Sequence, residues 1–443
     1  MSAEWLSILA LVALFVVGTL LPINMGALGF VAAWLVGTYA LGLSEREIID
    51  GISGDLVLTL VGVTYLFAIA RNNGTVDLIV RGAVRTVGGR VGLVPWVMFA
   101  VTAVLTAIGA ASPAACAIVG PIALGFAGRH RISPLMMGMF VVHGAQAGGF
   151  SPISIYGVIT NSVMRDNGLP VDEGAIFLAS FALNLAMAIA LFLALGGREL
   201  LGRRVAEGGP DGGPDGGPVD GTGDVDGAPS GGGGTATAVA ARRTVRTDQV
   251  ITLAAFVAVA LVALVFERNI GFTAITAAVI LTALFPKEQK GAITQIAWST
   301  VLLVAGVSTF ATILSTAGAP EAVGTWAAGL GTVLLGALVL CYVGGVTSAF
   351  ASSTALLPII IPIAVPLISS GAVSAVAVVA ALAVSSTVVD VSPFSTNGAL
   401  MVANRPDTIS EDRYYRQILG YGVIVTVAGP LVVWAAFVLS GVL

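Results

Sequence analysis

The chain has little charge and few cysteines for its length. Only 10% of its 443 residues are Asp, Glu, Lys or Arg, whereas 57% are hydrophobic, and the mean hydropathy is +0.98. Soluble domains carry about 25% charged residues, so this composition excludes soluble enzymes and nucleic-acid-binding proteins and predicts a polytopic membrane protein. The two cysteines, Cys116 and Cys341, both lie in apolar stretches and do not make a disulfide framework.

Aromatic residues are also scarce, at 7%, whereas glycine reaches 56 residues. This composition argues against a β-barrel with aromatic girdles and favours an all-α fold whose helices pack closely through small residues. Apolar runs such as Leu6–Leu21 and Leu253–Phe266 recur along the chain, and each covers most of a hydrocarbon core of about 30 Å. The first run follows only Glu4 and precedes no small-residue cleavage site, so we interpret it as a retained span rather than a signal peptide.

A segment without Lys or Arg divides the chain into two halves. Residues 207–234 contain 13 Gly, 4 Pro, 5 Asp and 1 Glu, a composition that cannot bury apolar surface. We therefore predict a flexible, disordered tether within residues 201–247. The tether holds six of the 24 acidic residues, so the net charge of −4 is a property of the tether and indicates nothing about a substrate.

Residues 1–200 and 248–443 each contain five predicted spans and one longer apolar segment. The spans cover roughly residues 4–22, 26–43, 55–71, 134–162 and 174–197, and then 248–266, 270–286, 298–316, 371–401 and 417–440. The longer segments, residues 91–127 and 333–369, are each broken near the middle by Ser, Pro and Thr. Each could be two crossings or one re-entrant hairpin that enters and leaves on the same side.

The basic residues decide between these options. If residues 91–127 open to the cytoplasm and residues 333–369 open outward, only Arg46, Arg165 and Arg268 lie outside, which leaves 17 of the 20 basic residues inside. That asymmetry follows the positive-inside rule. It predicts a multi-pass protein of the inner (plasma) membrane with both termini outside and the tether in the cytoplasm. An odd number of crossings in each half makes the two halves opposite in orientation.

Two pairs of similar segments support this inverted repeat independently. Residues 112–123, SPAACAIVGPIA, align with residues 353–364, STALLPIIIPIA, and six of the twelve positions are identical. Residues 150–157, FSPISIYG, align with residues 391–398, VSPFSTNG, and both pairs are 241 residues apart. An inverted repeat with a hairpin and a broken helix (134–162 and 371–401) in each half is typical of secondary transporters, which bind their substrate where helices are interrupted.

The breaks indicate where a substrate and ions bind. Unpaired backbone groups are costly in lipid, so a Ser-Pro break at membrane depth marks a cavity; the alternative is that Ser-Pro only kinks a packed helix. Half-helix ends offer N–H groups to an anion, while carbonyls with Ser, Thr and Asn oxygens suit Na⁺. The candidate substrate-binding residues are Ser112, Pro113, Ser151, Ser154, Tyr156, Ser353, Thr354, Ser392, Ser395, Thr396 and Asn397.

Charge is nearly absent from this predicted core. Asp390 is the only acid within an apolar run, and an intramembrane carboxylate is by default functional. Because it would repel an anion, we expect it to support a cation or carry a proton; alternatively, Ser392 or Ser395 satisfies it at a helix start. His143 could serve in coupling, although a neutral histidine packed in a bundle is commoner. The candidate cation-binding or coupling residues are Ser112, Gly149, Ser352, Ser353, Asp390, Asn397, His143 and Gln146. Na⁺ is the only metal expected, with no transition metal and no cofactor.

The layout of hairpins, broken helices and inverted copies resembles the divalent anion:sodium symporters of the ion transporter superfamily, and most of all the MatC-type dicarboxylate carriers associated with malonate. In the symporters each hairpin tip carries Ser-Asn-Thr ten residues before a proline. Here Ser352-Ser353-Thr354 stands at that distance from Pro362, and Ala111-Ser112-Pro113 from Pro121. The resemblance implies import of a small dicarboxylate such as malonate or succinate, coupled to Na⁺, by an elevator-type homodimer in the lipid bilayer.

Other functions are weaker alternatives. A Na⁺/H⁺ antiporter or a carrier of another anion, such as citrate or arsenite, is the second candidate, but an antiporter needs ionisable core groups, of which Asp390 and His143 are a small supply. A channel fits less well, because an inverted pair of hairpins suits alternating access. An intramembrane enzyme is the most remote alternative, since the sequence has neither an HExxH motif nor a Ser/His/Asp set with a convincing spacing.

The tether composition generates a first prediction. Replacing residues 208–234 with a neutral linker of equal length should leave uptake kinetics nearly unchanged, because this segment has no apolar surface with which to pack against the helices. Initial uptake rates at a series of substrate concentrations, in vesicles matched for protein content, measure the effect. A large loss of uptake would show that the tether does more than join the halves.

Overall fold

A computed structural model describes residues 2–443 except 22, 86–87, 204–244, 267, 288, 329–331, 350–352, 407 and 442. These residues form helices α1 to α20, two short 3₁₀ turns and a π-helical turn, and no β-strand is found among them. Six of the described helices, α1, α4, α7, α10, α14 and α20, are long and apolar enough to cross a membrane. The protein is thus an all-α polytopic membrane protein, as predicted. Residues 204–244 of the predicted tether lie outside the described part.

The helix bounds follow the chain in order. The first half contains α1 (Ala3–Leu20), α2 (Met25–Ala40), α3 (Glu45–Asp50), α4 (Gly54–Asn72), α5 (Thr75–Arg85), α6 (Val94–Ala107), α7 (Ser112–His130), α8 (Pro134–Gly148), α9 (Ile155–Asp166), α10 (Glu173–Ala194) and α11 (Gly197–Leu200). The second half contains α12 (Thr247–Val265), α13 (Ile270–Leu284), α14 (Trp298–Thr316), α15 (Ala319–Ala328), α16 (Val333–Ser348), α17 (Ser353–Ser369), α18 (Ala375–Val388), α19 (Thr396–Ala403) and α20 (Glu411–Trp434), which continues into the π-helical turn Ala435–Leu439.

Each interrupted segment of the sequence consists of two helices. Residues 91–127 fall mainly in α6 and α7, and residues 333–369 form α16 and α17. The broken helix 134–162 divides into α8 and α9, and the broken helix 371–401 into α18 and α19. Serine caps restart the chain after both breaks, because Ser154 accepts from the Gly157 N–H and Ser395 from the Gly398 N–H. The local sequence therefore sets both the interruption and the restart.

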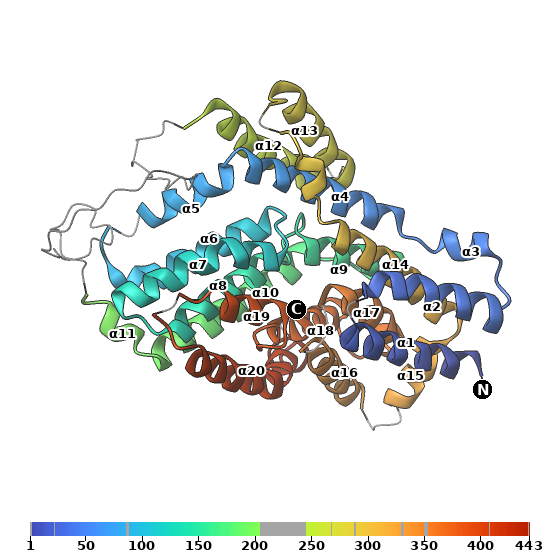
Figure 1. Cartoon of the computed structure of the whole chain (residues 1–443). Coiled ribbons are helices and arrows are strands. Elements are labelled where there is room, and N and C mark those ends of the chain that lie inside the picture. The colour runs from blue at the N-terminus through green and yellow to red at the C-terminus, as the bar shows by residue number, and fades with distance from the viewer. Residues whose placement is uncertain are drawn as a thin grey trace, which may run out of the picture.

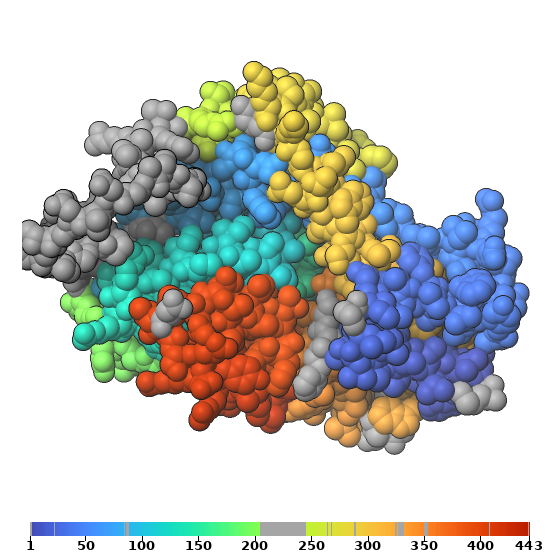
Figure 2. All heavy atoms as spheres, viewed as in Figure 1, coloured from blue at the N-terminus to red at the C-terminus, as the bar shows by residue number. Residues whose placement is uncertain are grey.

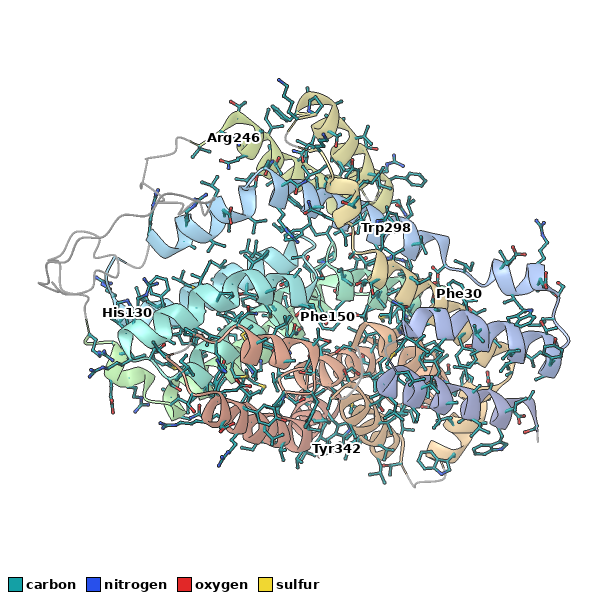
Figure 3. All side chains as sticks on the ribbon, viewed as in Figure 1. Phe30, His130, Phe150, Arg246, Trp298 and Tyr342 are labelled. Carbon is teal, nitrogen blue, oxygen red and sulfur yellow. The ribbon has the colours of Figure 1, made fainter. Side chains whose placement is uncertain are left out.

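The helices fall into two groups (Figure 1). We call α1–α5 and α12–α15 the frame helices, which occupy the top and right of the view, and α6–α11 and α16–α20 the core helices, which fill the centre and lower left. Figure 2 shows the N-terminal helices and the C-terminal helices on opposite sides of the same face. Phe150, in the first break, lies near the centre of the molecule (Figure 3) and is fully buried.

The frame helices pack through glycines at matched positions. Helix α2 packs on α14, and α13 packs on α4. A Cβ at Gly306 would lie 1.8 Å from the Gly26 carbonyl oxygen, and one at Gly62 would lie 2.6 Å from the Gly271 carbonyl oxygen. Such contacts between backbones require residues without a side chain. Asn24 caps α2 and Asn269 caps α13, so one helix of each pair begins after the same residue type.

The core helices surround the two broken helices. Helix α8 packs against α6, α7 and α10, and α18 against α16, α17 and α20. Contacts also cross between the halves, because α7 packs on α19 and α17 packs on α9. All of α8 after Pro134 and nearly all of α18 are buried. The two breaks therefore lie among packed helices.

The close approach of α2 and α14 generates a second prediction. The substitution Gly306→Ala should lower the unfolding midpoint of the purified protein by several degrees, because its Cβ would collide with backbone that cannot rotate away. Overpacking typically costs about 1–3 kcal/mol. Thermal unfolding followed by intrinsic fluorescence measures the shift. Gly82→Ala on α5 is the matched control, since a Cβ there meets nothing within 4 Å; equal midpoints for both variants would contradict the packing argument.

Candidate substrate and cation site

One cavity brings together the starts of α7 and α17 and both breaks. Its volume is about 420 Å³. The lining comes from the start of α7, the start of α17, the first turns of α9 and α19, and the first turn of α14. The residues are Ala110, Ala111, Ser112, Pro113, Ala114, Gly149, Ile155, Tyr156, Ser299, Thr300, Leu303, Ser353, Thr354, Asp390 and Thr396. Segments far apart in the sequence thus share one chamber.

The serines of the first break satisfy its backbone. Ser151 donates to the Ala107 carbonyl oxygen at 2.7 Å, which ties the break to the turn after α6. Ser154 donates to the carbonyl oxygens of Ser151, at 2.7 Å, and of Gly149. A Cβ at Gly157 would lie 2.0 Å from the Ser151 carbonyl oxygen, so the turn is closed by a residue without a side chain. Neither Ser151 nor Ser154 lines the cavity.

The second break repeats these contacts. Ser392 donates to the Ala349 carbonyl oxygen at 3.3 Å, and Ser395 donates to the Ser392 carbonyl oxygen at 2.7 Å. A Cβ at Gly398 would lie 1.9 Å from the Ser392 carbonyl oxygen. Ser392, Ser395 and Gly398 lie 241 residues after Ser151, Ser154 and Gly157, and Ala349 lies 242 residues after Ala107. Ser392 and Ser395 therefore shape the break and, like their counterparts, do not line the cavity.

Asn397 is not among the lining residues but joins the two halves beside the cavity, through bonds to two residues that do line it. Its side-chain Nδ2 donates to Ser112 Oγ of the first half at 2.8 Å and to Asp390 Oδ2 at 2.8 Å. The backbone N–H of Asn397 also donates to Asp390 Oδ1, at 3.2 Å. The Asp390 carboxylate is thereby held against the N-terminal turn of α19, where the helix dipole favours negative charge. Asn397 Oδ1 is buried and has no hydrogen-bond partner among the residues that the structure describes.

Ser353 is held in place and Thr354 faces the cavity beside it. Ser353 Oγ donates to the Ser386 carbonyl oxygen at 3.0 Å and lies 2.8 Å from Ser348 Oγ. These bonds fasten the start of α17 to α18 and α16. Thr354 and Tyr156 line the cavity from α17 and α9, which pack on one another. Ser352, the other candidate at this tip, lies outside the described residues.

The cavity has the electrostatics of an anion site that lacks basic side chains. Four of the core helices, α7, α9, α17 and α19, begin at it beside the start of the frame helix α14, and each helix N-terminus carries about half a positive charge. Asp390 is the one acid among the lining residues, and Lys and Arg do not occur among them. The arrangement can hold an anion at helix ends, and its carbonyl, hydroxyl and carboxylate oxygens can hold a small cation.

His143 and Gln146 lie away from this lining. His143, fully buried on α8, has Nδ1 2.8 Å from Asn184 Oδ1 on α10 and Nε2 2.6 Å from the Tyr421 hydroxyl on α20. Gln146 is also fully buried, and its backbone carbonyl accepts from Ser180 at 3.2 Å. The His143 bonds therefore connect the broken helix to α10 and α20 rather than to the cavity.

Sequence reasoning missed Ser299 and Thr300, which line the cavity from the start of α14. Asn24 donates to Ser299 Oγ at 3.1 Å, and at the matched position of the other half Asn269 donates to Asp55. The sequence does carry a signal for these contacts: Asn24 and Asn269 occupy matched positions, and each begins a frame helix that contacts the other half of the chain. Single hydroxyl residues in an apolar helix carry no such signal by themselves.

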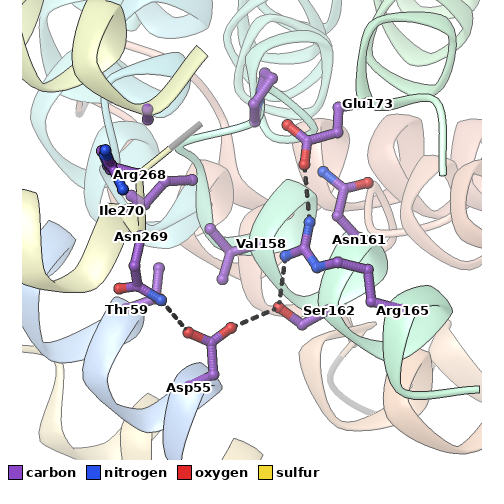
Figure 4. Close-up of a pocket in the computed structure, with 12 residues that line it drawn as sticks. Asp55, Thr59, Val158, Asn161, Ser162, Arg165, Glu173, Arg268, Asn269 and Ile270 are labelled. Carbon is purple, nitrogen blue, oxygen red and sulfur yellow. Dashed lines mark hydrogen bonds and ion pairs between the residues drawn. The ribbon is translucent and has the colours of Figure 1, made fainter. Parts of the chain in front are cut away.

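A second cavity, of about 610 Å³, borders the other face of the first break (Figure 4). Arg165 donates to Glu173 at 3.0 Å and to Ser162 at 3.2 Å, and Ser162 donates to Asp55 at 3.4 Å. Asn269 also donates to Asp55. This network links α9 and α10 of the core helices to the frame helices α4 and α13. Most of the polar side chains in this network bond to one another, so the network serves first as a contact between the core helices and the frame helices.

Comparisons with known proteins agree with the predicted resemblance. Residues 1–149 match the family model described as "Dicarboxylate carrier protein MatC N-terminus". This match confirms the predicted family resemblance over that part of the chain and favours a transporter over an enzyme. Sequences of curated proteins give no match.

A solved structure has a similar fold. The YdaH transporter of Alcanivorax borkumensis, reported to have an unusual topology, superposes with a TM-score of 0.59 at 14% sequence identity. The superposition covers 90% of this chain and 88% of that one. At such low identity the likeness concerns the fold alone, and it extends over nearly the whole chain, beyond the 149 residues of the family match.

The geometry of the breaks generates a third prediction. Gly398→Ala should abolish most uptake and lower the unfolding midpoint, because a Cβ 1.9 Å from the Ser392 carbonyl oxygen forces the second break open. Gly54→Ala at the start of α4 is the control, since a Cβ there meets nothing within 4 Å. Uptake and thermal unfolding are measured on the same preparations. A Gly398→Ala variant that behaves like Gly54→Ala would show that the turn tolerates a side chain.

Proposed function

We propose that this protein is a secondary active transporter that imports a small dicarboxylate, of malonate or succinate size, together with Na⁺. One observation carries the proposal: four helix N-termini converge on a cavity of about 420 Å³ that has no Lys or Arg in its described lining. The N-terminal match to a dicarboxylate carrier family supports the substrate class. The volume lies near the lower end of the range for small-molecule pockets.

The arrangement of the helix ends supports a ligand with two carboxylates. Helices α7 and α19 begin side by side, and so do α9 and α17. Each pair joins one half of the chain to the other. A dicarboxylate would place one carboxylate at each pair, with Ser112 and Thr396 at the first and Tyr156 and Thr354 at the second. Helix ends bind carboxylates through free N–H groups and the local dipole.

A bound cation would balance the remaining charge. Moving a dianion into a low-dielectric cavity is costly without compensation, and the helix ends supply only partial charges. Asn397 Oδ1 is a buried acceptor without a partner in the described part of the chain, and Asp390 contacts the same side chain. With carbonyl oxygens near Gly149 and the hydroxyls of Ser112 and Ser353, these groups suit Na⁺. The oxygen-rich donor set and the absence of soft ligands from the lining favour Na⁺ over a transition metal.

The two groups of helices suit an elevator mechanism. In it the core helices, which hold most of the cavity, would move as a unit against the frame helices. The matched contacts in the two halves support an inverted repeat, in which α6–α7 and α16–α17 are re-entrant hairpins that open to opposite sides. In this arrangement the protein lies in the inner membrane with both termini outside and the tether in the cytoplasm, and the frame helices pair in a homodimer.

A Na⁺/H⁺ antiporter is the second candidate, favoured by Asp390 alone. This carboxylate lines the cavity and is only 7% exposed, as an intramembrane proton carrier requires. An antiporter would move Na⁺ against H⁺ without a dicarboxylate, so the two functions differ in what the purified protein transports.

Uptake into proteoliposomes tests the proposed function. Radiolabelled malonate or succinate should accumulate when an inward Na⁺ gradient is present and not when K⁺ replaces Na⁺. Asn397→Ala should raise the apparent KM for Na⁺ about tenfold, equivalent to about 1.4 kcal/mol, with a smaller fall in the maximum rate, because it removes the free Oδ1 acceptor. Asn404→Ala, which removes only a bond to the Leu400 carbonyl oxygen, is the matched control.

Asp390→Asn distinguishes the possible roles of the carboxylate in the same assay. Loss of Na⁺ dependence assigns it to the cation site, whereas retained Na⁺ dependence with an altered pH profile assigns it to proton transfer. Uptake by the unmodified protein that is independent of both Na⁺ and H⁺ gradients would overturn the coupling and favour a uniporter or an exchanger. Na⁺/H⁺ exchange without dicarboxylate uptake would establish the second candidate.

A further inference from the structure

A long apolar groove runs between α10 and α20, away from the cavity described above. Its volume is about 570 Å³. Both helices pack on α18 and α8, and the groove lies between them. Along α10 the lining extends from Leu183 to Leu195, which corresponds to about 18 Å at the rise of an α-helix. This length is close to one leaflet of the hydrocarbon core, about 15 Å.

Small residues hollow out the groove. Ala190 and Ala194 face it from α10, and Gly420 and Ala428 face it from α20. A Cβ built at Gly420 would meet no atom within 4 Å. Larger apolar side chains, such as Met187, form the walls. The shape therefore suits a narrow, unbranched hydrocarbon chain better than the bulky side chains of another helix.

One end of the groove is basic. Arg416 and Gln417 line both the groove and an adjoining polar pocket of about 470 Å³, which Ser410, Asp412 and Arg413 complete. Two guanidinium groups thus face one carboxylate. Arg413 and Arg416 are exposed and make no ion pair within the described residues, whereas the nearby Glu411 pairs with Arg405. An anionic group would balance the excess positive charge.

We propose that this groove is a binding site for an anionic phospholipid of the surrounding bilayer. One acyl chain lies along α10 and α20, and the phosphate contacts Arg413 and Arg416. Apolar grooves between transmembrane helices with basic ends on the cytoplasmic side recognise anionic head groups, and the distribution of basic residues predicts that side for both arginines. The proposal rests on the groove and its charge, and it holds whichever solute the protein transports.

The groove wall is also connected to the first broken helix. Tyr421 lines the groove, and its hydroxyl lies 2.6 Å from His143 Nε2. His143 is on α8, which ends at the break, and its other ring nitrogen contacts Asn184 on α10. A lipid in the groove would therefore pack against the side chain that connects α20 to the helix leading into the cavity.

Lipid retention by the purified protein tests the site. The protein is equilibrated with mixed micelles that contain equal amounts of phosphatidylglycerol and phosphatidylcholine, and the bound lipids are counted by native mass spectrometry. We expect at least fivefold preference for phosphatidylglycerol. Arg413→Gln with Arg416→Gln should remove this preference, and Lys287→Gln, an exposed basic residue elsewhere, should retain it. Ala428→Phe should displace the bound lipid by filling the groove, whereas Ala182→Phe, exposed on α10 outside the groove, should not.

Each other outcome overturns the proposal. Equal retention of the two lipids would indicate non-specific annular lipid, and unchanged retention in Ala428→Phe would place the lipid elsewhere. A change of oligomeric state in Ala428→Phe, read from the same spectra, would identify the groove as a contact between two copies of the chain. The unfolding midpoint of each variant in lipid-free detergent shows whether it is folded, and a misfolded Ala428→Phe is replaced by Ala190→Phe on the opposite wall.

Discussion

The structure depends on the need to satisfy polar backbone inside an apolar protein. Each of the two broken helices stops and restarts among the packed core helices. In a chain in which 57% of the residues are hydrophobic, each interruption frees N–H and C=O groups that lipid cannot satisfy. The serines of the Ser-Pro breaks meet this need by bonding to nearby carbonyl oxygens. Glycines at 157 and 398 allow the chain to turn this tightly. These bonds hold the ends of four core helices around the cavity.

The same constraint explains why the cavity can dispense with basic side chains. A lysine or arginine would need its own compensating partners at this depth, whereas a helix end presents its N–H groups at no additional cost in buried charge. The hydrogen bonds of Asn397 then connect the halves, because one amide group contacts Ser112 and Asp390 together. Any movement of α19 relative to α7 would therefore alter the position of the Asp390 carboxylate relative to Ser112, because a single side chain bonds to both.

The sequence predicts much of this arrangement and misses specific parts of it for physical reasons. Repeated segments 241 residues apart located both breaks and the starts of α7 and α17, because residue identity and spacing are preserved between the two halves of the chain. The sequence placed Ser151 and Ser392 among the candidate substrate-binding residues, whereas in the structure they bond to backbone and do not line the cavity. A serine near a break can do either, and only the packing of the next turn decides which. The repeat predicted a shared site for Ser112 and Asn397, but their direct contact across 285 residues depends on how α7 and α19 pack. His143 was placed on the correct helix, but its partners on α10 and α20 depend on how three helices pack.

The two halves differ where their chemistry should differ. At the shared spacing, Gly149 of the first break corresponds to Asp390 of the second, and Tyr156 corresponds to Asn397. Both breaks keep the serines and the glycine that shape the turn, so their backbones are alike. The first break adds the aromatic ring of Tyr156 to the cavity lining, and the second adds the carboxylate of Asp390, which the buried amide of Asn397 contacts. Because different side chains stand on a common backbone, the two breaks present different chemistry to the cavity, an aromatic ring from the first and a carboxylate from the second. The repeated turn therefore shapes the cavity, and the side chains that depart from the repeat set its polarity.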